Sequence, residues 1–552
     1  MKVKRIFAAM LMLVSFLSGP INTLALSDYT ETVSVSDGQS IKAGNITVEG
    51  ATCAANVYAS QFDASLDVSG NVSIKSETSG TVISVQGNSA AATVDVAGDV
   101  TGESDYFIYG ISASGSATDA IKSTVSVGGD VSVSSDGNAI GVDSTDVDVT
   151  VGKDIIVDGE NVVGVRFSAV GNSEVNANSI NATGTSVTGA FLTSYAEGEE
   201  AADMTLNVAK DIVALASSET YGNATGIDLI NNGGEIHANV EGNVEAYAGN
   251  DGEATGIRML SETLPESIDR QNNVYVGGDI ISDGYGIFAG GFDSKTKFNV
   301  VVNGTISANK SAILLEDNNF VNNNFDLTAW QILSNDNGNY AERITIENDK
   351  KVQVRDQEFE KNINYIIKTD KITGAKIRLE GTSDKNGIVT AKAGAKVTLK
   401  IDLEENYSIL GAYNGLEEKV GLLQDDAGNY YVIVPNGGGV LLSLALAYVI
   451  PTTPVDATKV VTGIATNRAD GGVLGVRVEK QENKEENKEN ETLPGAAEAT
   501  TFEDETLAGV QGADDGAPMW WVWSLIVLAS AAGYGVYKYA DTKKKAANTN
   551  GK

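Results

Sequence analysis

The chain has 552 residues, of which 60 are glycine and only 7 are proline, and its formal net charge is −35. This composition excludes a collagen-like triple helix, which needs abundant proline, and an extended nucleic-acid-binding face, which needs clustered basic residues. The length exceeds what one ordinary hydrophobic core can serve, so we expect several domains. The strongly negative net charge leads us to expect no nucleic acid among the partners.

The first 26 residues have the pattern of a secretory signal peptide. A basic start with Lys2, Lys4 and Arg5 precedes an apolar run over residues 6–17, and small residues near Ala25 offer a cleavage site. We therefore expect export of the protein and removal of residues 1–26.

A self-similar unit recurs through residues 27–320. It reads V-x-V, then a small residue, Gly and Asp or Asn before Val or Ile, then a variable loop, then Gly-Ile or Gly-Val. The Asp or Asn position is occupied in successive clear copies by Asn71, Asp99, Asp130, Asp154, Asp211, Asn243 and Asp279, with a degenerate copy, VNANSINA, between the fourth and fifth and a last copy near Thr305. Successive positions are 28, 31 and 24 residues apart early on, and 32 and 36 residues apart later.

A period near 30 that varies only between fixed motifs predicts a parallel β-solenoid, an all-β fold in which each unit is one coil. Short β-branched runs form the strands and Gly-Asp or Gly-Asn pairs form the turns. Stacked coils then place apolar residues in register, and we expect one buried ladder of Val131, Ile155, Ile212, Val244 and Ile280. A sandwich of antiparallel hairpins is the alternative, although it needs no self-similar unit of this length.

This organisation resembles the filamentous adhesin-like and autotransporter-passenger β-helices of bacterial surface proteins, over about residues 28–320. The resemblance implies a surface-displayed β-helix. Autotransporters end in a β-barrel, whereas this chain ends in one apolar segment, which points to a Gram-positive-type envelope.

Residues 321–450 are richer in charge and aromatic side chains and keep strand-like runs, so we expect one or two compact β modules that also cap the solenoid. Part of this region resembles the small β-repeat modules of Gram-positive surface proteins. The matching positions are Gly394, Val397 to Leu399, Tyr407, Asp426 with Gly428, and Pro435. Asn406 departs from that pattern, which has glycine there.

The last hundred residues predict a tether and a membrane anchor. Residues 451–518 are polar, charge-dense and of low complexity, so we expect a disordered acidic linker. Residues 519–537 carry no charge and are long enough for one transmembrane helix, with Trp520 at one end and the basic tail 538–552 on the cytoplasmic side. The LPGAA stretch at 493–497 resembles a sortase signal, but Ala496 replaces threonine and the stretch lies well ahead of the apolar segment. We therefore favour a retained helix.

Two unique residues limit the chemistry. Cys53 is the only cysteine, so no intramolecular disulfide can form, and we expect a small buried residue, with an exposed or cross-linking thiol as the alternative. His237 is the only histidine and lies in a strand-like run, which excludes sites built on several imidazoles.

No catalytic, cofactor-binding or metal-binding residues are expected, because the sequence contains no phosphate-binding loop, nucleophile elbow or zinc spacing. Five aspartates could line up along the solenoid, but a residue repeated in every coil is expected to serve the turn. These are Asp99, Asp130, Asp154, Asp211 and Asp279. Arg166 and Arg258 each follow the Gly-Ile or Gly-Val step of their coil closely and are candidates for inspection.

The sequence therefore predicts a non-enzymatic, membrane-anchored extracellular protein, adhesin-like or structural, whose solenoid presents a binding surface. Its expected partners are the membrane, through the C-terminal helix, and a host or neighbouring-cell glycan or matrix protein. The alternatives are a carbohydrate-active β-helix, either a polysaccharide lyase or a hydrolase, and a passive stalk without a specific ligand.

Overall fold

The computed structural model describes residues 26–116, 121–197, 200–201, 203–217, 222–249, 252–261, 270–291, 296–316, 324–334, 339–415 and 420–449. The predicted signal peptide up to residue 25, the linker 451–518, the membrane segment 519–537 and the tail 538–552 lie outside these ranges. Across the described ranges, no helix is long and apolar enough to span a bilayer.

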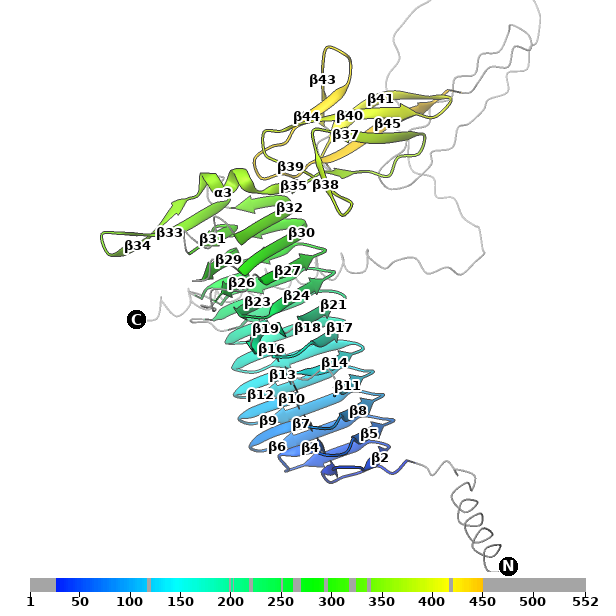
Figure 1. Cartoon of the computed structure of the whole chain (residues 1–552), viewed down its shortest axis with the longest axis vertical. Coiled ribbons are helices and arrows are strands. Elements are labelled where there is room, and N and C mark those ends of the chain that lie inside the picture. The colour runs from blue at the N-terminus through cyan, green and yellow to red at the C-terminus, as the bar shows by residue number, and fades with distance from the viewer. Residues whose placement is uncertain are drawn as a thin grey trace, which may run out of the picture. The chain divides into compact units, whose positions relative to one another are not determined.

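The repeat region folds as a parallel β-solenoid of about nine coils, each contributing one strand to each of three rows (Figure 1). Row one contains β2 (Ser40–Ala43), β5 (Ala64–Val68), β8 (Ala92–Val96), β11 (Ser123–Val127), β14 (Val147–Val151), β17 (Ser173–Ala177), β21 (Asp203–Val208), β24 (Glu235–Val240) and β27 (Arg270–Val276). Row two contains β3 (Ile46–Glu49), β6 (Val72–Ser76), β9 (Val100–Ser104), β12 (Val131–Ser135), β15 (Asp154–Asp158), β18 (Ser179–Gly184), β22 (Ile212–Ala216), β25 (Val244–Tyr247) and β28 (Ile280–Ser282).

Row three contains β1 (Val33–Val35), β4 (Cys53–Ala59), β7 (Ser79–Gly87), β10 (Phe107–Ser114), β13 (Asn138–Thr145), β16 (Asn161–Ala169), β19 (Ser186–Glu197), β23 (Asn223–Asn232), β26 (Ala254–Ser261), β29 (Tyr285–Gly291), β31 (Ile313–Leu315) and β33 (Ala341–Glu347). The longer strands β30 (Thr296–Ala308) and β32 (Phe325–Ser334) continue rows one and two, and β20 (Glu200–Ala201) pairs with β19. Pairing within each row is parallel from coil to coil, so the sandwich of antiparallel hairpins is wrong for this region.

The predicted apolar ladder is confirmed in row two. Val131 pairs in register with Ile155, and the column continues through the degenerate copy at Ile180 to Ile212, Val244 and Ile280. All six side chains are fully buried. Since burying one such side chain stabilises a fold by about 1.5–3 kcal/mol, a coil that cannot bury its apolar face alone gains stability by stacking.

The Gly-Asp turns between rows one and two connect each coil to the next. The backbone N–H of Asp130 donates to Oδ1 of Asp99 (2.9 Å), and the N–H of Asp154 donates to Oδ1 of Asp130 (3.0 Å). A Cβ at Gly129 would lie 2.0 Å from Asp99 Oδ1, so glycine leaves room for this carboxylate. We name the column of Asp and Asn side chains at this turn the corner ladder. It begins at Asp28, whose Oδ1 accepts from Asn45 N (2.6 Å).

The Gly-Ile and Gly-Val steps bend the strands of row three. At Gly141 the alternation of inward and outward residues breaks, because Gly141 and Val142 both face the core. A Cβ at Gly141 would lie 2.5 Å from Cγ2 of Ile155 and 2.6 Å from the carbonyl oxygen of Gly164 in the next coil. The residue two positions after each of these glycines therefore occupies the equivalent position on the outer face of row three, directly above or below its counterpart in the neighbouring coil.

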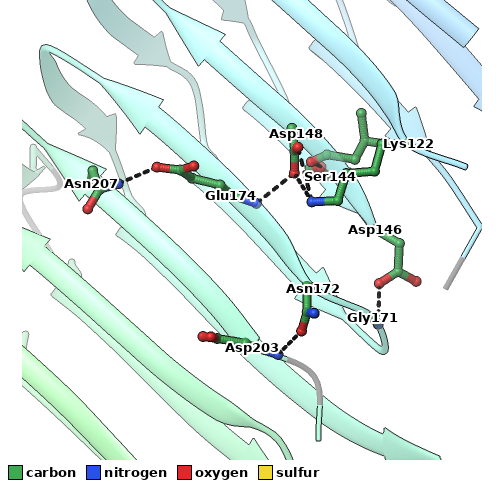
Figure 2. A network of polar contacts seen from close by, with 10 residues as sticks. Lys122, Ser144, Asp146, Asp148, Gly171, Asn172, Glu174, Asp203 and Asn207 are labelled. Carbon is green, nitrogen blue, oxygen red and sulfur yellow. Dashed lines mark hydrogen bonds and ion pairs between the residues drawn. The ribbon is translucent and has the colours of Figure 1, made fainter. Parts of the chain in front are cut away.

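At the turn between rows three and one, single side chains hold the loops of the following coil (Figure 2). Asp146 Oδ1 accepts from the N–H of Gly171 (2.8 Å), and Asn172 Oδ1 accepts from the N–H of Asp203 (3.0 Å). At this turn, side-chain oxygens thus add to the hydrogen bonds between neighbouring coils.

An antiparallel hairpin and a short helix end the parallel stack. Strand β33 forms an antiparallel hairpin with β34 (Lys350–Arg355), which is followed by the short helix α3 (Gln357–Asn362). Phe359 of α3 stacks on Phe325 of β32, with ring centroids 5.4 Å apart. The buried Arg343 guanidinium pairs with Asp356 (2.5 Å), whose Oδ1 also accepts from Phe359 N and caps the helix.

A small β module follows, built from two four-stranded sheets. Its strands and those that join it to the solenoid are β35 (Asn364–Ile366), β36 (Lys368–Thr369), β37 (Ala375–Glu380), β38 (Ser383–Lys385), β39 (Ile388–Ala391), β40 (Lys396–Leu403), β41 (Tyr407–Asn414), β42 (Val420–Gly421), β43 (Leu423–Gln424), β44 (Tyr430–Ile433) and β45 (Leu441–Tyr448). Strand β35 continues row one beside β32 and then pairs antiparallel with β39. Asn406 has a φ of 72°, a left-handed conformation that glycine adopts without strain, and glycine is the residue that the module pattern compared above has at this position.

Candidate functional site

The five aspartates singled out from the sequence lie in the corner ladder, where their oxygens bind the turn of the next coil. Besides the two bonds described above, Asp211 Oδ1 accepts from Asn243 N (2.7 Å) and Asp279 Oδ1 from Thr305 N (2.6 Å). At the degenerate copy, Asp154 instead accepts from the side chains of Asn178 and Ser179. Because these carboxylates hold the turns, the ladder is part of the scaffold.

The two unique residues lie on outer faces of the solenoid. Cys53 is half-buried and pairs with Thr81 on row three, and burial raises the pKa of its thiol. The expectation of a small buried residue therefore holds only in part. His237 is a strand residue of β24, as expected, with Nε2 3.3 Å from Asp203 Oδ1 and Nδ1 3.2 Å from Asn273 Nδ2.

Arg166 and Arg258 occupy equivalent outward positions on row three, and each contacts an aspartate of the preceding coil. Arg166 donates from Nε and Nη2 to the two oxygens of Asp143 (2.7 and 2.5 Å), and also to the Tyr109 hydroxyl (3.1 Å). Arg258 contacts Asp228 from Nη1 alone (3.1 Å).

These arginines belong to a column in which the order Asp, Arg, Phe occurs twice. The register partners in successive coils are Asp143, Arg166, Phe191, Asp228, Arg258 and Phe288. We name the first three residues the lower triad and the last three the upper triad. A signal for this column was present in the sequence, since the Gly-Ile and Gly-Val steps continue as GVD, GVR, GAF, GID, GIR and GIF.

The two triads differ in how well their ion pair is satisfied. In the lower triad, both oxygens of Asp143 accept from one guanidinium. In the upper triad, the Asp228 side chain is only 8% exposed, yet among the described residues its Oδ1 has no hydrogen-bond partner. Burial raises the pKa of the Asp228 carboxyl, and the Arg258 charge opposes that shift only in part. A buried acceptor without a partner is costly, so the upper triad is the better candidate site.

The upper triad forms one side of a groove of about 540 Å³ on the outer face of row three. The middle of the groove is a line of register partners, Thr188, Thr225, Thr255 and Tyr285. Asp228, Arg258, Phe288 and Leu314 line one side, and Ser186, Asn223 and Glu253 line the other. The groove therefore crosses the strands and follows the direction in which the coils stack.

The hairpin β33–β34 contributes the end of the groove nearest the last coils. Ile344 and Gln353 line it, and Gln353 Nε2 donates to the Tyr285 hydroxyl (3.0 Å). On the far side, Lys310 Nζ lies 3.4 Å from Glu253 Oε1 and 5.1 Å from the centre of the Tyr285 ring. Glu253 is therefore paired, which leaves Asp228 Oδ1 as the unsatisfied acceptor of this lining.

Comparison with known proteins does not assign this chain to a family. No protein-family model, curated protein or solved structure matches this chain. In the described part of the chain, no group of three or more His, Cys, Asp or Glu side chains is placed to hold a metal ion.

Proposed function

We propose that this chain is an exported, membrane-anchored surface protein whose solenoid binds an extracellular ligand in the row-three groove. The observation that carries the proposal is the buried, unsatisfied Asp228 oxygen in a groove also lined by Arg258 and two aromatic side chains. Among the buried side-chain atoms of the described residues that lack a partner, Asp228 Oδ1 is the carboxylate oxygen, and it carries the largest cost. A ligand that donates a hydrogen bond to this carboxylate removes that cost.

The display at the cell surface is supported by sequence features that lie outside the described residues. These are the signal-peptide pattern of residues 1–26, the uncharged segment 519–537 and the basic tail 538–552, with the linker 451–518 between solenoid and membrane. We place the solenoid outside the cell and the tail in the cytoplasm, in a Gram-positive-type envelope.

Binding without catalysis fits this groove better than carbohydrate cleavage does. Polysaccharide-cleaving sites need clustered carboxylates with distinct acid and base roles. The described groove lining holds two carboxylates, and each is paired with a cation. Cleavage remains the second candidate, because burial raises the pKa of Asp228, as a general acid requires.

The proposal is tested with the full chain in two assays. Protease added to intact cells should remove the solenoid and leave the tail protected; a solenoid that resists external protease in intact cells but not in lysed cells contradicts surface display. The full chain, purified in detergent, should bind members of a glycan and matrix-protein array, and release of reducing ends from a bound glycan would favour the enzyme instead.

A further inference from the structure

From the chemistry of this groove, we infer that its ligand is a linear, uncharged glycan lying along the coil-stacking direction, with one sugar hydroxyl pair bound between Asp228 and Arg258. This inference rests on the proposed function and names its ligand class. Three features of the groove lead to it: its periodicity, its pairing of acceptor and donor, and its aromatic side chain.

The periodicity comes from the middle line of the groove. Thr188, Thr225 and Thr255 are register partners in successive coils, so their hydroxyl groups recur at about 4.8 Å, the spacing of neighbouring strands. An extended pyranose chain advances by a similar distance with each residue. A groove with one hydroxyl group per coil therefore suits a polymer that offers polar groups at the same interval.

The upper triad provides an acceptor and a donor side by side. Asp228 Oδ1 has no hydrogen-bond partner and is covered from solvent, whereas the Arg258 guanidinium is 41% exposed and held by a single bond to Asp228. In the proposed complex the guanidinium turns to donate to an acceptor of the ligand, and the carboxylate turns an oxygen toward a donor. Adjacent sugar hydroxyl groups supply both, since each hydroxyl donates and accepts. A purely cationic group would satisfy Asp228 alone, and an anionic polymer would face Asp228, Glu253 and a chain of net charge −35.

Phe288 follows Arg258 in the column and provides an apolar surface beside this polar pair. Sugar rings present C–H faces that pack on aromatic side chains, while their edges carry hydroxyl groups. The hairpin residues Ile344 and Gln353 bound the groove beyond β29. We therefore expect the bound length to correspond to the coils of β19, β23, β26 and β29.

The lower triad serves as an internal control. It has the same residue types, but Asp143 is fully engaged by Arg166, and the middle line carries Ile140 and Val163 in place of threonine. Substitution of Asp143 should therefore disturb one outer-face ion pair of row three without touching the groove.

The experiment measures binding of neutral oligosaccharides to the full chain purified in detergent, by calorimetry. The probes are linear gluco-, manno-, xylo- and galacto-oligosaccharides of increasing length, with oligogalacturonate, oligolysine and collagen as competitors of other chemistry. We expect at least one neutral series to bind, with affinity that stops rising once the chain covers four coils. Asp228→Asn should weaken binding about tenfold or more, because it removes both the charge that strengthens the bond to the sugar hydroxyl and the ion pair that positions Arg258. Phe288→Ala should weaken binding about tenfold or more, because it removes the aromatic contact. Asp143→Asn should not weaken it.

The outcomes separate this inference from the proposed function. If collagen, oligolysine or oligogalacturonate binds and Asp228→Asn abolishes that binding, the groove binds a ligand but the neutral-glycan class is wrong. If a neutral glycan binds equally to wild type, Asp228→Asn and Phe288→Ala, this site is wrong while a ligand-binding solenoid stands. If no probe binds, the inference and the ligand-binding function fail together. The variants are compared only where their thermal unfolding matches wild type; Phe288→Leu, which keeps an apolar side chain without the ring, replaces Phe288→Ala if the latter unfolds early.

Discussion

Substitutions at Asp130 separate a structural role of the corner ladder from a chemical one. Asp130 Oδ1 accepts from Asp154 N at 3.0 Å, and Asp130→Ala removes that acceptor while leaving the N–H at a partly buried corner. A hydrogen bond to a charged acceptor contributes about 1.5–3 kcal/mol, so we expect the free energy of unfolding to fall by about that amount. Asp130→Asn keeps the oxygen, as Asn71 and Asn243 do in other coils, and should cost less than about 1 kcal/mol.

Because coils contact only their neighbours, a local measurement is more informative than a global melting curve. Native-state hydrogen exchange should reveal faster exchange of the Asp154 amide in Asp130→Ala, by about tenfold for each 1.4 kcal/mol lost, with amides of distant coils unchanged. Urea unfolding followed by circular dichroism supplies the total change in stability. Equal losses for the Asn and Ala variants would refute the reasoning, since the charge and not the accepting oxygen would then matter.

Three further predictions test other parts of the structure. Since burial raises the pKa of the Asp228 carboxyl above its ordinary 3.8, the folded state holds that proton more tightly than the unfolded state. The contribution of Asp228 to the free energy of unfolding should therefore fall as pH rises through the interval above 3.8. Urea midpoints measured from acid to neutral pH should show this slope in wild type and lose it in Asp228→Asn. Gly129→Ala, whose Cβ would meet Asp99 Oδ1 at 2.0 Å, should lower the urea midpoint strongly, whereas Gly421→Ala, with open space around it, should change it little. Cys53, with a raised thiol pKa, should react with iodoacetamide at neutral pH more slowly in the folded chain than in urea, and equal rates would contradict its burial.

The coil architecture was predictable because it depends on local rules repeated many times. The spacing of Gly-Asp pairs placed Val131 and Ile155 in one column, and the structure pairs them. The degenerate copy concealed Ile180, which fills the same column although its turn carries Asn178 without a preceding glycine.

The groove was not predicted, although the sequence contains the pattern of the outer column that lines one side of it. Arg166 and Arg258 were the residues of this column noticed in the sequence, whereas comparison of the residue after each Gly-Ile or Gly-Val step, with the Gly-Ala step at Gly189 included, shows the order Asp, Arg, Phe twice. The end of the groove depends on a tertiary contact, which the sequence pattern does not show. Gln353 reaches Tyr285 across 68 residues, through a hairpin whose position no local pattern specifies. Cys53 is half-buried and not fully buried for a related reason, since Ala54 and Ala55 both face the core and break the alternation along β4.

The corner ladder also makes the number of coils adjustable. In the clear copies, the ladder side chain accepts from the backbone N–H of the equivalent turn in the following coil, as Asp99 and Asp130 do. Excision of residues 130–153 would join Gly129 directly to Asp154 and bring the Asp154 N–H opposite Asp99 Oδ1, while Ile155 would stack on Val100. Whole coils can thus be lost or duplicated while the bond pattern of the ladder is kept, so the distance between the groove and the first coil can change while the lining of the groove stays the same.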